Sequence, residues 1–365
     1  MTEHFESQYA PDYVSPPGET LLEVLEDAGL TQAELARRMG MTAKTVSGIV
    51  KGDEPITPAT CQLLERVLGI PATFWSNREG RYRVYIQGKK EEEELSGCEW
   101  WSSMFPYAAM AKLGWLPASS PTQWLERTRN LLGFFGVGSP EQWGTVYGAL
   151  EVSYRAKGWE PDLGAAAAWL RRGEILGRQA ECAPYDATRF RDAIPELRRL
   201  SVLDPQRIEP RLKGTCAECG VVVVFVPLLP KTHAWGATRW LTPTKALVQL
   251  SLKYKHDDHF WFTFFHECCH VLRHNKTQFL ELDGAGGELE EEADRFAESV
   301  LMRADAYNRF IASHQLFSRH AVMEFASALG ISPGIVVGRL QHDGRLPKTH
   351  LNDLKVSFPW LEGSA

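Results

Sequence analysis

The spacing of hydrophobic residues predicts two short amphipathic helices near the amino terminus. Thr31 is placed to cap the first helix, and the second is expected from Ala43 to about Val50. The segment Gly40-Met41-Thr42 provides a turn between them, and Gly52 ends the second helix. Two short helices joined by a tight turn that contains glycine are typical of a helix-turn-helix.

The pattern changes twice further along the chain. Residues 96–210 show helical spacing, many tryptophans and no strand-like run. Three apolar stretches then predict strands at Val221–Val226, Ala234–Leu241 and Ala246–Leu252. From Asp257 onward the spacing is helical again. Strands followed by helices indicate an α+β fold, which is mostly helical over the whole chain.

These changes divide the chain into three predicted parts. An all-α helix-turn-helix domain is expected in residues 1–95, because the charged run Lys89–Glu94 has no apolar face and ends or links a unit. A helical middle region, interpreted as a packing or dimerisation domain with buried tryptophans, covers residues 96–210. A domain with a small sheet covers residues 211–365. A length of 365 residues is also too great for one compact core.

Composition narrows the class of protein. The chain has 46 acidic and 40 basic side chains, a net charge of −6, and 44% hydrophobic residues, which excludes a disordered or collagen-like protein. Its longest strongly apolar stretch, Val221–Val226, is far shorter than the roughly 18 residues of a membrane span, and the acidic amino terminus lacks the apolar core of a signal peptide. Seven scattered cysteines indicate a reducing compartment. We therefore expect a soluble cytoplasmic protein without membrane contact.

Local charge supports nucleic-acid binding by the amino-terminal helices. Residues 30–90 contain ten basic and five acidic side chains within a chain that is acidic overall. The second helix exposes small or basic side chains that can approach base edges or phosphates of double-stranded DNA. The candidate DNA-binding residues are Gln32, Thr42, Lys44, Thr45 and Ser47. The alternative is a helical hairpin that only packs against its neighbours.

The segment His266-Glu267-Cys268-Cys269-His270 fits the H-E-x-x-H pattern of zinc sites. Histidines four residues apart lie on one helix face, about 6 Å apart along the axis, so both imidazoles can reach one zinc ion. At about 100° per residue, the large apolar side chains around the motif fall on the opposite face, and Glu267 falls at the edge of the polar face. This position favours Glu267 as a general base acting on water at the metal. The alternative is a histidine pair that serves only packing.

A zinc site of this kind needs a third protein ligand. His274 continues the row, but its distance from His266 is about 12 Å along a straight helix, which is too long for a shared ion. A carboxylate from the helix predicted to begin near Glu288 is the other source. Glu290 and Glu292 flank the buried stripe of that helix on opposite sides, and periodicity alone slightly favours Glu290. A solvated acidic face is the alternative.

The amino-terminal part resembles a known family of regulators. The segments GLTQAELA (29–36), VSGIV (46–50) and ITP (56–58) are similar to the Xre-type helix-turn-helix, and with LGIP (68–71) they resemble the HigA antitoxin branch more closely. The resemblance covers about residues 16–83. It implies a dimeric repressor that binds operator DNA and often regulates its own promoter.

The carboxyl-terminal part resembles the ImmA/IrrE family of metallopeptidases. The segments FTFFHECCH (262–270) and EEEADRFA (290–297) match the family's F-T-x-x-H-E-x-x-H and E-x-E-A-x-x-F-A helices in the right order. The resemblance implies a zincin-like domain with a zinc cofactor that hydrolyses peptide bonds. The implied metal ligands are His266, His270 and Glu292, the glutamate that precedes the alanine, and the implied catalytic base is Glu267. The cysteine pair inside the motif departs from the small or apolar residues that are usual there.

The sequence therefore supports two alternative functions. The first is a DNA-binding transcriptional regulator with a zinc-dependent endopeptidase domain. It would cleave a regulatory protein, such as a repressor or toxin-like partner, to control gene expression in stress, prophage or toxin–antitoxin systems. The second is a non-catalytic, HigA-like antitoxin or autorepressor whose peptidase-like domain binds a toxin or ligand. A homodimer is expected, and the intact H-E-x-x-H motif favours the first function.

Overall fold

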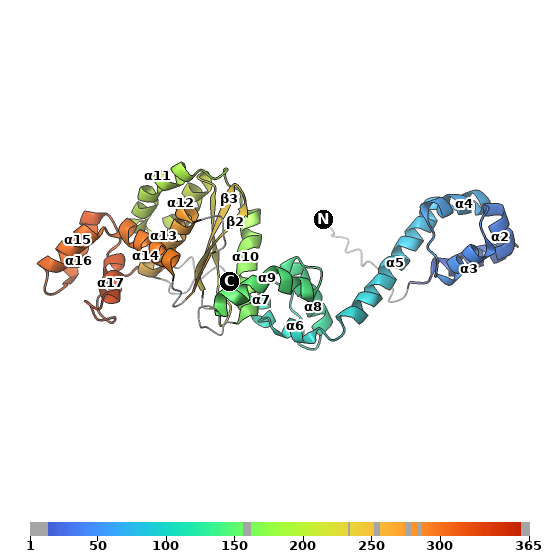
Figure 1. Cartoon of the computed structure of the whole chain (residues 1–365), viewed down its shortest axis with the longest axis horizontal. Coiled ribbons are helices and arrows are strands. Elements are labelled where there is room, and N and C mark those ends of the chain that lie inside the picture. Colours follow the sequence, from blue (N-terminus) through green and yellow to red (C-terminus); the bar gives the residue numbers. More distant parts are fainter. Residues whose placement is uncertain are drawn as a thin grey trace, which may run out of the picture. The chain divides into compact units, whose positions relative to one another are not determined.

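The computed structural model describes residues 14–155, 162–232, 234–251, 256–274, 279–282 and 287–358 (Figure 1). Contacts along the backbone divide the chain into two compact units, Met1–Gly97 and Cys98–Ala365. The predicted middle region and the predicted carboxyl-terminal domain thus fall within one compact unit.

The first unit is helical throughout its described residues. Its helices are α1 (Pro17–Asp27), α2 (Gln32–Met39), α3 (Ala43–Lys51), α4 (Pro58–Leu68) and α5 (Ala72–Leu95). The predicted helix pair corresponds to α2 and α3. Thr31 and Thr42 cap these helices, each accepting a hydrogen bond from the backbone amide three residues later, at 3.2 and 3.1 Å. Gly40 and Gly52 end them in the left-handed conformation, with φ of 68° and 79°.

A small apolar core holds the helices of the first unit together. Its buried side chains include Leu21 of α1, Leu35 of α2, Val46 of α3, Leu64 of α4 and Trp75 of α5. Helix α1 approaches α3 most closely at Gly18, where an added Cβ would lie 2.0 Å from the carbonyl oxygen of Val50. Any side chain would collide with that backbone, so glycine is required at this position.

The charged run at the end of the first unit is helical. Lys89–Glu94 forms the last turns of α5, which continues to Leu95. Ion pairs between residues three or four apart, Lys89 with Glu92 and Lys90 with Glu94, lie along this part of the helix. The run therefore ends the unit while remaining in regular secondary structure.

The second unit contains the remaining helices and a sheet. The helices before the sheet are α6 (Glu99–Ser103), α7 (Tyr107–Lys112), α8 (Trp124–Phe135), α9 (Pro140–Arg155), α10 (Leu163–Gln179), α11 (Ala187–Arg199), the 3-10 turn η1 (Leu200–Val202) and α12 (Pro205–Glu218). The later ones are α13 (Asp257–Arg273), α14 (Glu288–Leu301), α15 (Ala304–Ser313), α16 (Arg319–Leu329), α17 (Pro333–His342) and the 3-10 turn η2 (Asn352–Leu354). Trp101, Trp143 and Trp169 are buried, as predicted for this region, whereas Trp100 is 60% exposed.

The sheet has the strand order β1-β3-β2-β4. Its strands are β1 (Val221–Val226), β2 (Ala234–Thr242), β3 (Lys245–Ser251) and β4 (Phe279–Leu282). Strand β1 is parallel to β3, whereas β2 is antiparallel to both β3 and β4. The first three strands confirm the sequence prediction. Strand β4 was not predicted, because four residues are too few to show a clear alternation of polar and apolar positions.

Helices cover both faces of this sheet, with α10 on one face and α11 to α13 on the other (Figure 1). Alternate residues of β1 point to opposite faces. Val222 and Val224 share a core with Trp169 of α10, whereas Val221 and Val223 share a core with α11, α12 and α13. Helices from the predicted middle region therefore belong to the same cores as the strands that follow them.

No single helix in the described part of the chain is long and apolar enough to cross a membrane. Helices α16 and α17 have the length and composition of a membrane span only when they are counted together, and the chain bends by 114° between them. Val322 and Ala326 of α16 and Val336 and Leu340 of α17 are buried in the larger core.

Asp257, at the start of α13, is a buried carboxyl group whose ionisation opposes folding. It is 1% exposed and accepts hydrogen bonds from the Ser332 hydroxyl and, at 3.1 Å, from the Val356 amide. Burial outweighs these bonds and raises the pKa of Asp257 to about 6. The folded protein therefore holds this proton more tightly than the unfolded chain does. The contribution of Asp257 to the free energy of unfolding falls as the pH rises from about 4 to about 6.

We expect the Asp257→Asn substitution to remove this pH dependence. The free energy of unfolding of the variant minus that of the wild type should increase by on the order of 3 kcal/mol between about pH 4 and pH 7. The size follows from the shift of about two units in the pKa of Asp257. Denaturant unfolding followed by tryptophan fluorescence measures this difference, with the exposed Asp192→Asn as a control. The same pH dependence in Asp257→Asn and the wild type would contradict the prediction.

Candidate metal centre

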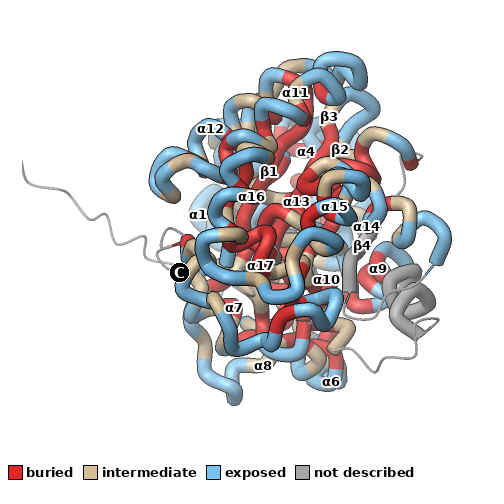
Figure 2. The backbone as a smooth tube through the Cα atoms, turned by 90° about the vertical axis from the view of Figure 1, so that its left-hand side faces the viewer, coloured by how far each residue is buried: buried red, intermediate tan, exposed pale blue. Residues whose placement is uncertain are grey.

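The H-E-x-x-H motif lies in the middle of α13, in the interior of the second unit (Figure 2). Trp261, Phe264 and Phe265 are fully buried and pack this helix into the larger core, as its apolar face predicts. The motif residues His266–His270 are also buried. Buried imidazole and carboxylate groups require polar partners or a metal ion.

The partners of the two histidines converge on α14, which packs against α13 (Figure 1). The Nε2 atoms of His266 and His270 lie 3.0 Å apart, and Oε2 of Glu290 lies 3.1 Å from the first and 3.6 Å from the second. Ligand atoms arranged tetrahedrally around zinc, at bond lengths near 2.0–2.1 Å, are about 3.3 Å apart. The three separations therefore match one triangular face of such a tetrahedron.

The other ring nitrogen of each histidine is held by a further side chain. His266 Nδ1 lies 2.9 Å from Oδ1 of Asp294, and His270 Nδ1 lies 2.7 Å from Nδ1 of His274. When these bonds are donated by the two histidines, both Nε2 lone pairs face Glu290. Histidines that ligate metals almost always donate their second nitrogen in this way.

The charge states of the triad also suit a cation. Burial alone would raise the pKa of Glu290, but the proximity of His266 and His270 holds it well below its usual value. Burial lowers the pKa of His270, which favours the neutral imidazole. Neutral imidazole and ionised carboxylate are the forms that bind zinc. The residues present therefore fit a zinc ion by both geometry and donor chemistry.

The structure places Glu290, and not the expected Glu292, beside the histidine pair, so its geometry favours Glu290 as third ligand. Oε1 of Glu292 accepts a hydrogen bond from Arg273 Nη1 at 2.9 Å, and Oε2 lies 3.4 Å from His274 Nε2. Two residues along a helix correspond to a rotation of about 200°, so both glutamates cannot face the same histidine pair. Periodicity alone favours Glu290, and the structure agrees with periodicity.

Glu267, the predicted catalytic base, is fully buried against strand β2. The Thr238 hydroxyl on β2 donates a hydrogen bond to Oε2 of Glu267. Gly236 lies directly against the same carboxylate, since an added Cβ would be 2.4 Å from Oε1. The strand thus holds the Glu267 carboxylate in one orientation.

Three residues of this site were not identified from the sequence. Asp294 lies four residues after Glu290, one helical turn away, and this spacing could have indicated it. Gly236 and Thr238 come from a separate strand, and Thr238 precedes Glu267 by 29 residues. No local pattern connects that strand with the motif.

The predicted DNA-binding residues lie in the first unit on α2 and at the start of α3. Thr42 and Lys44 are exposed, and Gln32, Thr45 and Ser47 are partly exposed. The hydroxyl groups of Thr42 and Thr45 are 2.8 Å apart, so both take part in the cap of α3. The start of the second helix is the part that contacts base edges in helix-turn-helix proteins.

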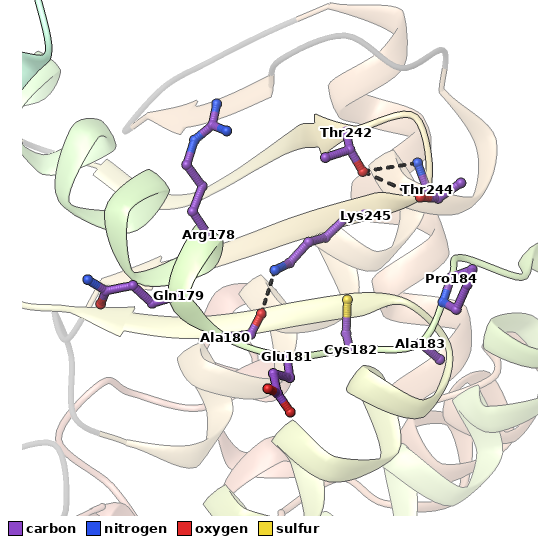
Figure 3. Close-up of a pocket in the computed structure, with 10 residues that line it drawn as sticks. All are labelled: Arg178, Gln179, Ala180, Glu181, Cys182, Ala183, Pro184, Thr242, Thr244 and Lys245. Atoms are coloured by element: carbon purple, nitrogen blue, oxygen red, sulfur yellow. Dashed lines mark hydrogen bonds between the residues drawn. The ribbon is translucent and has the colours of Figure 1, made fainter.

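A polar hollow of about 520 Å³ lies elsewhere in the second unit, between the end of α10 and the β2–β3 hairpin (Figure 3). Lys245 donates a hydrogen bond to the carbonyl oxygen of Ala180, and Arg178 pairs with Glu174 of α10. Because protein groups already bind the Lys245 and Arg178 side chains, this hollow is a weaker candidate for a functional site than the triad on α13 and α14.

Comparison with known proteins identifies the helix pair of the first unit. Residues 21–75, which include α2 and α3, match the family model described as Helix-turn-helix. One similar solved structure, from Nostoc punctiforme PCC 73102, is described as an antidote protein of a plasmid maintenance system, with 23% identity over 23% of this chain and 92% of that one and a TM-score of 0.22. Another is an addiction module antidote protein of a HigA family from Coxiella burnetii, with 25% identity over the same shares and a TM-score of 0.21. No curated protein matches the chain. The predicted helix-turn-helix is confirmed, and the chain contains a DNA-binding domain of this type.

Proposed function

We propose that this chain is a transcriptional regulator in which the helix-turn-helix domain is joined to a zinc-dependent, zincin-like endopeptidase domain. The peptidase would cleave a regulatory protein, a repressor or toxin-like partner, and thereby control gene expression. The observation that carries the enzymatic half is the triangle formed by Nε2 of His266, Nε2 of His270 and Oε2 of Glu290, with sides of 3.0, 3.1 and 3.6 Å.

The buried side chains around the triad suit peptide hydrolysis. A zinc ion bound by the triad would lower the pKa of water and polarise the scissile carbonyl group. The Glu267 carboxylate, held by Thr238, takes a proton from the attacking water and returns it to the leaving amine. Asp294 and His274 keep the two imidazoles oriented through their Nδ1 atoms.

The proposal includes a homodimer. A second copy of the chain would present a second α3, so that the pair contacts the two half-sites of an operator.

Two measurements on the full-length protein test the proposal. Metal analysis of the purified protein is expected to find tightly bound zinc, and cells that produce it are expected to contain protein N-termini absent from cells with an empty vector. Operator binding without zinc and without new N-termini would instead favour a non-catalytic autorepressor.

The Lys44→Ala substitution tests the DNA-binding surface. Lys44 is exposed on α3, and removal of one phosphate contact should weaken binding to a mixed-sequence DNA duplex several-fold. The slope of log affinity against log salt concentration should become less steep by about 0.9. Fluorescence anisotropy at several salt concentrations measures both quantities. Lys112→Ala, an exposed change in the second unit, is the control, and identical slopes for the two variants would exclude a phosphate contact by Lys44.

A further inference from the structure

A second set of metal-ligating side chains lies beside the triad, on the same pair of helices. Cys269 comes from α13, His274 is the C-cap of that helix, and Glu292 comes from α14. One ligand atom from each residue, a sulfur, a ring nitrogen and a carboxylate oxygen, lies within 4.8 Å of the others. None of the three belongs to the triad of His266, His270 and Glu290.

This set has the chemistry of a site for a soft divalent cation. Thiolate, imidazole and carboxylate all bind zinc, and a thiolate favours soft ions over magnesium or calcium. Around a tetrahedral ion such ligand atoms lie about 3.5 Å apart, so separations of up to 4.8 Å must contract by at most about 1.3 Å. The Glu292 side chain is 37% exposed and can move this far by a change of rotamer.

Glu292 can exchange its ion pair with Arg273 for a metal ion at a small cost in free energy. Its partner Arg273 is 50% exposed, and a surface ion pair of this kind contributes little to stability. The Arg273 guanidinium also lies 4.9 Å from the ring centre of Phe296, a contact that it can keep after it releases the carboxylate. His274 Nε2 already faces Glu292, at 3.4 Å.

Cys269 gives this set its selectivity. The side chain is fully buried, and its sulfur lies within 4.8 Å of a ring nitrogen of His274 and a carboxylate oxygen of Glu292. Binding of a divalent cation replaces the thiol proton, which leaves to solvent, and forms a sulfur–metal bond. The resulting thiolate and the Glu292 carboxylate together balance the two positive charges of the ion.

We propose that Cys269, His274 and Glu292 form a second cation site, selective for a thiophilic divalent metal such as zinc or cadmium. The site is separate from the triad proposed for catalysis. Its existence does not depend on peptidase activity.

Titration of the metal-free, full-length protein with cadmium chloride, in the presence of a phosphine reductant, tests this proposal. Cadmium bound to a thiolate gives an ultraviolet charge-transfer band that imidazole and carboxylate ligands alone do not give. We expect the band in the wild type and in Cys268→Ser, and we expect its loss in Cys269→Ser. Cys268 is a matched control, because it is equally buried and adjacent but does not belong to the second set.

A pair of surface variants covers the case in which Cys269→Ser does not fold. Glu292→Gln should lower the affinity for cadmium, measured from this band, at least tenfold. Glu291→Gln, with its side chain 68% exposed, should leave the affinity unchanged. The band should persist in Glu290→Ala, which removes only the triad, so failure of the triad and failure of the second site are distinguishable. Absence of the band in the wild type, or its persistence in Cys269→Ser, would overturn the proposal.

Discussion

Replacement of Glu290 by glutamine is expected to lower the affinity of the purified protein for zinc by about a hundredfold or more. The amide keeps the shape of the side chain but removes the charge that faces the Nε2 atoms of His266 and His270. Loss of a residue that only orients a metal ligand already costs about 10–100-fold, and Glu290 is itself in a ligand position. Competition with a chelator of known affinity, followed by metal analysis, measures the change.

Glu291→Gln is the matched control for this experiment. Glu291 is the next residue on α14, its side chain is 68% exposed, and its substitution changes the net charge by the same amount. We expect this variant, and Glu292→Gln, to keep the tightest zinc site of the wild type. Equal zinc affinity of Glu290→Gln and Glu291→Gln would show that the triad does not hold the metal.

Substitution of Glu267 by glutamine is expected to abolish proteolysis while zinc remains bound. Glutamine cannot accept the proton of the attacking water, and general acid–base catalysis typically contributes about a hundredfold to ten-thousandfold in rate. The Thr238 hydroxyl can still donate a hydrogen bond to the amide oxygen, so we expect the local structure to be retained. Mass spectrometry of protein N-termini in cells that produce the wild type or the variant measures the loss.

The same comparison distinguishes a catalytic from a structural role of Glu267. Glu291→Gln, which lies outside the buried site, should yield the N-termini of the wild type. An unchanged set of N-termini in Glu267→Gln would exclude the role of base. Loss of zinc together with loss of cleavage would instead indicate that Glu267 supports the fold of the site.

Local patterns in the sequence predicted most of the elements that position the site. The cap at Thr31 and the strand Val221–Val226 were predicted correctly, because each depends on residues close together in the chain. The packing of α10 against the sheet was not predicted. It depends on contacts such as the hydrogen bond of 3.0 Å from Trp169 Nε1 to the carbonyl oxygen of Val226, which joins segments far apart in sequence.

The part of the candidate site that lies on a single helix could be predicted from the sequence. The spacing of His266 and His270 along α13 indicates their common face without any knowledge of the fold. The third candidate ligand depends on how α14 is rotated against α13. The family pattern points to Glu292, whereas the structure turns Glu292 toward Arg273 and His274 and Glu290 toward the histidine pair. Periodicity detected the correct side, since the burial of Ala293 and Ala297 fixes the rotation of α14.

The three atoms of the triad are supplied by two separate helices, α13 and α14. An ion shared between them acts as a cross-link that only the folded chain can form. By mass action it adds about 2.7 kcal/mol of stability when free metal exceeds the dissociation constant a hundredfold. If the triad holds zinc as proposed, scarcity of zinc would loosen the attachment of α14, and the lifetime of the regulator in the cell would follow the supply of zinc.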